Sequence, residues 1–123
     1  MEFDELSHRV IGCALEVHKT LGPGLLESTY EQCLAFELSS ADIPFTVQAA
    51  LPVRYKEMLI DCGYRVDLFV ENQLILELKS VDRLLPIHNA QLLTYMKLAK
   101  VRTGLLINFN VTMLRDGIKR IVL

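Results

Sequence analysis

The stretch DLFVENQLILELKSV, from Asp67 to Val81, restricts most strongly how this chain can fold. Apolar residues alternate on both sides of the polar break at 71–73, which is typical of a β-hairpin. Asp67, Glu77 and Lys79 nevertheless lie inside the two strands. Charged groups in a strongly apolar hairpin need solvent, a partner or a ligand to offset their desolvation.

The register of this hairpin decides whether the two carboxylates meet. Side chains alternate along a strand, so Glu77 and Lys79 share one face. A three-residue loop at 71–73 would put Asp67 opposite Glu77 and on the same side of the sheet. A two-residue turn at 72–73 would place Asp67 on the other face.

Two interpretations of the charged residues follow. A Glu-x-Lys pair on a strand face is often only a solvated ion pair. Alternatively, the two carboxylates share a functional site. Carboxylates that share a site repel each other, and removing one would relieve that repulsion. A hard divalent cation such as Mg²⁺ also removes the repulsion and keeps waters for chemistry. Lys79 would then assist a metal-bound water or stabilise phosphate charge, as in metal-assisted phosphodiester hydrolysis. The apolar strands around the charges favour the second interpretation.

Helical periodicity covers three segments of the sequence. The first two, 3–22 and 25–42, are adjacent helices separated by the Gly-Pro-Gly turn at 22–24. The third helix, 86–100, opens with Pro86. Its expected buried side consists of Ile87, Ala90, Leu93 and Met96, or of Leu92 and Leu98.

The remaining segments predict strands, in the overall order α-α-β-β-β-α-β-β. An α/β fold with helices against a mixed central sheet, forming a single domain over 1–123, is the simplest architecture for that order. The predicted strands cover 45–59, 62–71, 73–81, 103–109 and 118–123.

Composition excludes several classes of protein. The 123 residues suit one domain, and at 51% hydrophobic residues they can form a core. The three cysteines form no CxxC pair, which disfavours zinc ribbons and disulfide scaffolds and fits a cytoplasmic protein. No apolar run reaches the ~20 residues that cross a membrane. Thirteen basic residues against fifteen acidic ones leave only local basic surfaces, at 97–102 and 115–120, for nucleic acid.

Several spaced motifs resemble one family across nearly the whole chain. Gly24, Glu27 and Tyr30 match the signature of the GxxExxY protein family, within the PD-(D/E)XK nuclease superfamily. Gln91 and Tyr95 form a Q-x-x-x-Y element similar to that of recombination-type and phage exonuclease-like members. The resembling stretches are VHKTLGPGLLESTYEQCL, ELKSV, AQLLTY, GLLINF and DGIKRIV.

The resemblance implies a restriction-endonuclease-like core and a metal-dependent nuclease that acts on DNA or RNA. It implies that Asp67 and Glu77 bind Mg²⁺ or Mn²⁺, that Lys79 assists the attacking water, and that Leu78 lends its carbonyl to the metal. Glu27, in the first turn of the second helix, is a candidate third metal ligand. Its alternative role is a favourable interaction with the helix dipole.

Further polar residues are candidates for supporting roles. His88, Gln91 and Tyr95 form an uncharged stripe on the third helix. Gln91 would position Lys79 or a water, while Tyr95 and His88 would contact the substrate. Tyr30 either packs or hydrogen-bonds near the site. His18 either interacts with its own helix dipole or contacts phosphate or metal.

A metal-dependent nuclease is therefore the leading hypothesis. The alternative is a non-catalytic module that keeps the nuclease fold and binds nucleic acid or protein, and a third possibility is a regulatory partner of a larger nuclease system. A homodimer is possible, because small nucleases often cut two strands as a pair. Binding that does not depend on metal would favour the alternatives.

Overall fold

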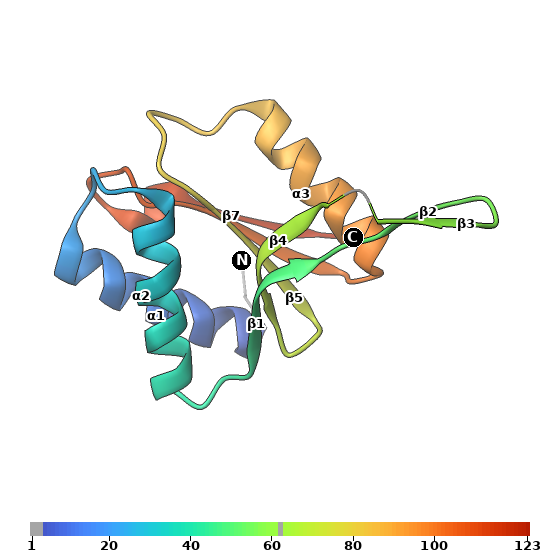
Figure 1. Ribbon diagram of the computed structural model, residues 1–123. Helices are drawn as coiled ribbons and strands as arrows, with labels where there is room; N and C mark the ends of the chain where they lie inside the picture. The colour runs from blue at the N-terminus through green and yellow to red at the C-terminus, as the bar shows by residue number, and fades with distance from the viewer. Residues whose placement is uncertain (1–3, 62) are drawn as a thin grey trace.

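A mixed five-stranded sheet, in the order β1-β4-β5-β6-β7, forms the centre of the computed structural model, with helices on both faces (Figure 1). The structure describes residues 4–61 and 63–123. The first residue of the predicted helix at 3–22 and the first residue of the predicted strand at 62–71 lie outside the described residues. The helices are α1 (Glu5–Leu21), α2 (Glu27–Ser40), α3 (Pro86–Ala99) and the 3₁₀ helix η1 (Leu114–Gly117). The strands are β1 (Phe45–Ala50), β2 (Val53–Tyr55), β3 (Met58–Ile60), β4 (Arg65–Val70), β5 (Leu74–Lys79), β6 (Thr103–Asn108) and β7 (Ile118–Val122).

The hairpin quoted above forms β4 and β5, in the interior of the sheet. Val70 pairs with Leu74, and Leu68 pairs with Leu76, so the loop at 71–73 has three residues. Asn72 lies in the left-handed region, with φ 54°. β5 then pairs in parallel with β6, and α3 makes the connection between them. The three-residue loop that the sequence predicted is confirmed.

The sheet separates two hydrophobic cores. α1 and α2 pack on one face against residues such as Leu76 and Leu78 of β5. α3 packs on the other face, against residues such as Ile75 and Leu106. Alternation along β5 therefore places Glu77 and Lys79 on the α3 side of the sheet.

The predicted strand at 45–59 was wrong as a single element. After β1 the chain leaves the main sheet at Pro52, and the Lys56-Glu57 turn folds β2 against β3 as a separate two-stranded sheet. Figure 1 shows this pair as an arm that projects from the body. We call residues 53–60 the β2–β3 arm. Proline cannot donate to a sheet ladder, which accounts for the break.

The expected buried side of α3 was correct only in part. Leu92 and Met96 are fully buried against the sheet. Ile87 is 58% exposed, and Ala90 is also exposed. The helix turns its 92–96–99 side to the sheet, so the 87–90 side points away from it.

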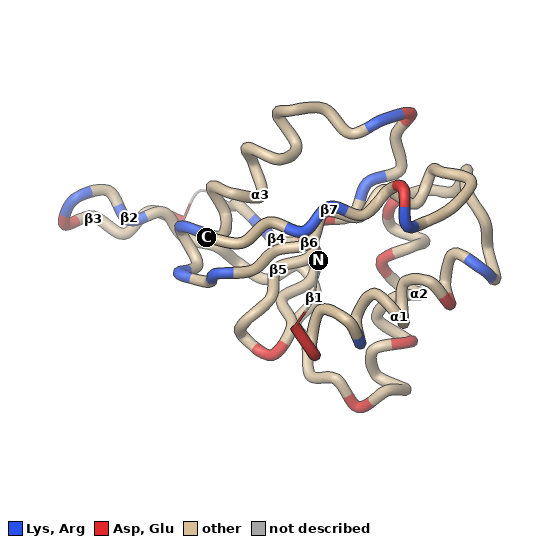
Figure 2. Tube along the Cα trace, turned by 180° about the vertical axis from the view of Figure 1, so that it is seen from behind, with Lys and Arg blue, Asp and Glu red and all other residues tan. Residues whose placement is uncertain are grey.

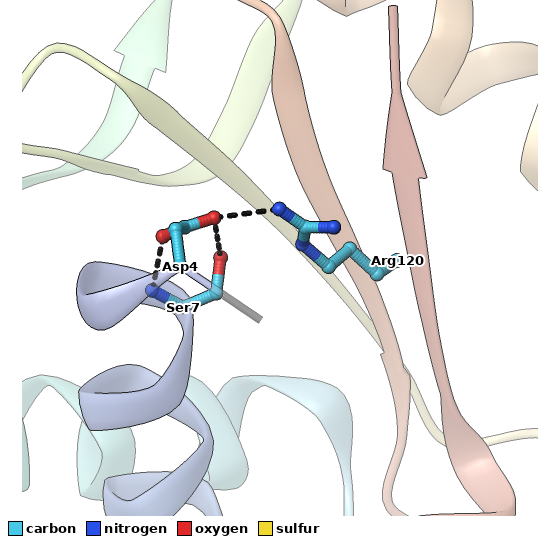
Figure 3. Close-up of polar contacts among 3 residues, drawn as sticks. All are labelled: Asp4, Ser7 and Arg120. Atoms are coloured by element: carbon cyan, nitrogen blue, oxygen red, sulfur yellow. Dashed lines mark hydrogen bonds and ion pairs between the residues drawn. The ribbon is translucent and has the colours of Figure 1, made fainter. Parts of the chain in front are cut away.

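Asp4 fixes the start of α1 and connects it to the last strand (Figure 3). Its carboxylate accepts hydrogen bonds from the amide and the hydroxyl of Ser7, at 2.8 and 2.9 Å. It also forms an ion pair with Arg120 of β7, with an N–O distance of 2.8 Å. Capping of this kind satisfies an amide that the first helical turn leaves unpaired. Within the described part of the chain, no helix is long and apolar enough to span a membrane.

Candidate active site

A row of residues crosses the sheet at the level of Glu77. Glu77 of β5 is the register partner of Leu106, which in turn pairs with Lys119 of β7. Continuing the β4–β5 register by one residue places Asp67 opposite Glu77. Continuing the β1–β4 register in the same way places Gln48 opposite Asp67. Four of the five strands thus bring a polar side chain to one line, with Leu106 the apolar member.

The two carboxylates meet where the ladder between β4 and β5 ends. The amide of Asp67 donates to Oε1 of Glu77, at 3.2 Å, and the amide of Leu78 donates to Oδ2 of Asp67, at 2.8 Å. Side-chain oxygens therefore take the place of main-chain carbonyls as the strands separate. Both carboxylates are held by backbone amides, which fixes their positions next to each other.

Gln48 and Glu31 join this pair, and the sequence analysis did not single out Gln48. Gln48 has φ 50° within β1, a left-handed conformation that is uncommon for a non-glycine residue in a strand. Its side-chain amide donates to Oδ1 of Asp67, at 3.3 Å, and also to Glu31 of α2. Glu31, expected to be solvated, is instead partly buried. The distortion of β1 therefore aims an amide at two carboxylates.

Burial and neighbouring charge make the Glu77 carboxyl a weak acid. Glu77 is 9% exposed. Burial, followed by the negative charge of Asp67, raises its pKa from 4.5 to about 8, although Lys79 and the Asp67 amide act in the opposite direction. Burial likewise raises the pKa of Glu31, with a further contribution from Asp67. The cluster thus holds more negative charge than its surroundings compensate.

Lys79 lies two residues beyond Glu77 on the same strand and is partly buried. Among the described residues, no carboxylate lies within ion-pair distance of its amine. The next residue, Ser80, contacts the start of α2 and the residues before it. Its amide lies 3.4 Å from Oε2 of Glu27, and its hydroxyl donates to the carbonyl of Leu25 at 2.6 Å. Glu27 is exposed at this rim, and its charge contributes to the raised pKa of Glu77.

Asn108 is a second residue that the sequence analysis missed, and it holds the chain that leaves the site. It is 1% exposed at the end of β6. Its side chain bonds both main-chain groups of Val81, accepting at 3.1 Å and donating at 2.9 Å. Gly117 lies against it, because a Cβ there would be 2.2 Å from the Asn108 carbonyl oxygen. This packing anchors the segment that follows Lys79.

The polar stripe on α3 has three different environments. His88 accepts a hydrogen bond from the Leu85 amide at Nδ1, at 3.0 Å, and so caps the helix. Gln91 is exposed and borders a groove with Tyr64 and Tyr95. Burial, followed by the charge of Glu77, raises the pKa of Tyr95, which lies within electrostatic range of the carboxylates. Of the three stripe residues, Tyr95 is thus the one whose pKa responds to the charge of the carboxylate cluster.

Tyr30 and His18 have structural contacts away from solvent. Tyr30 is fully buried and stacks on Phe109 with ring centroids 4.4 Å apart. Its hydroxyl donates to the Gly22 carbonyl at 2.6 Å and accepts from the Leu25 amide at 3.2 Å. His18 is 9% exposed, and its Nε2 donates to the Val111 carbonyl at 2.8 Å. Tyr30 therefore offers no exposed surface to a substrate, and both residues hold loops in place.

Replacing Tyr30 with phenylalanine is expected to lower the free energy of unfolding by about 1–3 kcal/mol, because the Gly22 carbonyl and the Leu25 amide lose their partner. Urea denaturation measures this change. Tyr55→Phe is the matched control, since Tyr55 is 56% exposed and should change stability by less than about 0.5 kcal/mol. Equal stability of the two variants would contradict the structural role of Tyr30.

The carboxylates fit a divalent cation by their chemistry. Hard cations bind oxygen ligands, and a cation would offset the burial and the Asp67 charge that together make Glu77 a weak acid. Within residues 4–61 and 63–123, however, no three His, Cys, Asp or Glu side chains form a group that could hold a metal ion. The arrangement is therefore a pair, Asp67 and Glu77, with Glu27 at the rim.

Comparison with known proteins gives one clear result. A family model described as the PD-(D/E)XK nuclease superfamily matches residues 4–121, nearly the whole chain. No significant match was found among curated proteins or among solved structures. The matched span contains the hairpin, the row of polar residues and the helices on both faces of the sheet.

Proposed function

This chain belongs to the PD-(D/E)XK nuclease superfamily, and from that premise we propose that it is a divalent-metal-dependent nuclease that hydrolyses phosphodiester bonds of DNA or RNA. The observation that carries the proposal is the hydrogen bond from the Asp67 amide to the Glu77 carboxylate, which holds the two acidic residues together where β4 and β5 separate. The GLLESTY stretch from Gly24 to Tyr30 supports placing it in the GxxExxY family.

Asp67 and Glu77 are the proposed metal ligands, for Mg²⁺ or Mn²⁺. A bound ion would supply positive charge that activates water and stabilises the phosphate. Glu27, at the rim, is proposed as a further ligand. The Leu78 carbonyl is also a candidate, because the Leu78 amide donates to Asp67 and this residue therefore lies beside the carboxylates. Lys79 is the proposed group that holds the attacking water or the phosphate, since no carboxylate in the described range pairs with it.

Basic residues near the site suit a nucleic-acid backbone. Lys119 is exposed and lies in the same row as Glu77, two strands away, which is about 10 Å at the usual strand spacing. Arg120 pairs with Asp4 at the start of α1 and is less suited to a phosphate. Figure 2 shows further basic residues on the β2–β3 arm, whereas the charged residues of α2 are acidic. Phosphate contacts of this kind supply most of the affinity that does not depend on sequence.

A cleavage assay tests the proposal. The purified protein is incubated with single-stranded and duplex DNA and RNA, with Mg²⁺, with Mn²⁺ or with EDTA. Cleavage should require a divalent ion and should be lost in Asp67→Asn. Binding of nucleic acid or of a protein partner without cleavage, unaffected by EDTA, would instead favour a non-catalytic module that keeps the fold.

Replacing Gln91 with alanine is expected to lower turnover by about 10-fold or more, if Gln91 positions Lys79 or a water. The folding midpoint should hardly change, because Gln91 is exposed. Single-turnover cleavage and urea denaturation measure the two effects separately. Gln32→Ala, the same change at an exposed glutamine of α2 outside the groove and the carboxylate cluster, is the control. A large loss of stability with normal activity per folded molecule would show that Gln91 is structural.

A further inference from the structure

A groove lies on the side of α3 that faces away from the sheet, between this helix and the base of the β2–β3 arm. Its volume is about 370 Å³, within the range of small-molecule sites. Aromatic and apolar side chains make most of its wall, with an amide and a hydroxyl among them. The lining residues are Val53, Tyr64, Ile87, Ala90, Gln91, Thr94, Tyr95 and Leu98.

Two tyrosines form the aromatic part of the wall. The rings of Tyr64 and Tyr95 have centroids 6.2 Å apart and are tilted by 51°. Tyr64 is 45% exposed, so part of the residue is accessible to a ligand. An exposed aromatic ring beside groove-lining amide and hydroxyl groups suits a flat ligand with polar edges.

One residue of the groove wall also lies near the carboxylate cluster. Tyr95 lines the groove and also lies within electrostatic range of Glu77 and Asp67. A ligand in the groove would therefore be next to the proposed site of phosphodiester hydrolysis.

Two exposed cations are sequence neighbours of residues that line the groove. Arg65 follows Tyr64 in the chain, and Arg54 follows Val53; both arginines are exposed. Arg65 donates to the carbonyl of Tyr64, which holds its guanidinium beside the backbone of this groove residue. A ligand with a flat polar ring and a negatively charged backbone matches this combination of aromatic wall and basic rim.

We propose that this groove binds an unpaired nucleobase of the substrate, stacked on Tyr64, while Arg54 and Arg65 contact the adjoining phosphates. The proposal rests on the proposed nuclease function and narrows its substrate class. A base inside a duplex is already stacked and cannot enter the groove. The preferred substrate is thus single-stranded nucleic acid or a duplex with an unpaired segment.

Binding without cleavage tests the proposal most directly. Dye-labelled single-stranded DNA of about 12 nucleotides, the length of a typical single-strand site, is titrated in EDTA and followed by fluorescence anisotropy. RNA of the same sequence and the corresponding DNA duplex form the other two arms. Wild type should bind a single strand at least about 10-fold more tightly than the duplex, and Tyr64→Ala should weaken single-strand binding by about 5- to 100-fold.

Two controls separate stacking from folding. Tyr64→Phe keeps the ring and should bind within about twofold of wild type, since stacking uses the aromatic face. Phe36→Ala removes another exposed aromatic side chain, 68% exposed on α2 at the opposite face of the sheet, and should bind normally. Circular dichroism checks that each variant is folded.

An abasic substitution at each nucleotide in turn locates the contact. Loss of one particular base should weaken binding to wild type and have no further effect on Tyr64→Ala, as expected for two groups that interact directly. Wild-type affinity of Tyr64→Ala for the single strand would overturn the proposal. So would a dimer in sedimentation equilibrium that Tyr64→Ala dissociates, because a second copy would then cover the groove.

The outcome for the groove is separable from the outcome for catalysis. If wild type cleaves with Mg²⁺ while Tyr64→Ala binds and cleaves equally well, the groove proposal fails and the nuclease proposal stands. If wild type never cleaves, but Tyr64→Ala loses single-strand binding, the groove proposal stands and catalysis fails.

Discussion

Asp67→Asn is expected to cut nucleic acid at least about 100-fold more slowly than wild type in Mg²⁺, because even groups that only support a metal ligand contribute 10- to 100-fold. The substitution removes the negative charge and keeps a side-chain oxygen. That oxygen can still accept the Leu78 amide, which donates to Asp67 at 2.8 Å. Single-turnover cleavage, with the urea midpoint measured in parallel, therefore reports the charge and not the fold.

Asp42→Asn is the matched control for this substitution. Asp42 is exposed, and its φ of 57° is one that asparagine also adopts. Its activity should equal that of wild type. Cleavage by Asp67→Asn at the wild-type rate would show that the Asp67 carboxylate serves only to hold the Leu78 amide, and the proposed site would fail.

Alanine at Asp67 is a poorer test, for a reason that the sequence alone could not provide. From sequence, removing either carboxylate should relieve repulsion and stabilise the metal-free protein. In the structure, Asp67→Ala would also leave the amide of Leu78 without its partner in the core. An unpaired buried amide costs about 1–3 kcal/mol, which opposes the gain from reduced repulsion.

The hairpin was predictable because two independent patterns agree. Alternating apolar residues fix which side chains share a face, and the polar break at 71–73 limits the loop to two or three residues, of which only three bring both carboxylates to one face. The register follows, and Asp67 and Glu77 are placed together. Gln48 was not predictable, because TVQAA resembles an ordinary strand and nothing in it signals a left-handed residue. Asn108 was missed because it lies at the end of a continuous apolar run.

The errors in the remaining elements also have physical causes. Apolar residues occur on more than one side of α3, so helical spacing alone does not select the buried side. Contact with Gly104 of β6, where a Cβ would lie 2.7 Å from the Met96 sulfur, does. The turn between β2 and β3 consists of Lys56 and Glu57, which are not typical turn residues. Tertiary contacts decide both features.

Glu77→Gln is expected to stabilise the metal-free protein by roughly 3 kcal/mol near neutral pH, from the difference between its folded-state pKa of about 8 and its ordinary value of 4.5. Between these two values the Glu77 carboxyl is protonated in the folded state and ionised in the unfolded chain. The folded state then holds one more proton. The contribution of Glu77 to the stability of wild type should therefore be greatest below the lower value and fall by about 1.4 kcal/mol per pH unit until the pH passes about 8.

Urea denaturation in EDTA at several pH values between about 5 and 8.5 measures this dependence. The difference between wild type and Glu77→Gln isolates Glu77, because the two proteins differ at no other position. Glutamine keeps the oxygen that accepts the Asp67 amide, at 3.2 Å, so the hydrogen bond is matched. A constant difference across this pH range would mean that the buried carboxyl does not bind the extra proton.

Adding Mg²⁺ should reverse the order of stability of wild type and Glu77→Gln. A cation binds the ionised form of Glu77, so adding Mg²⁺ should release a proton and raise the stability of wild type by mass action. Glu77→Gln has no charge to offer at this position, so its gain should be much smaller. Stabilisation of both proteins by the same amount would place the ion somewhere other than Asp67 and Glu77.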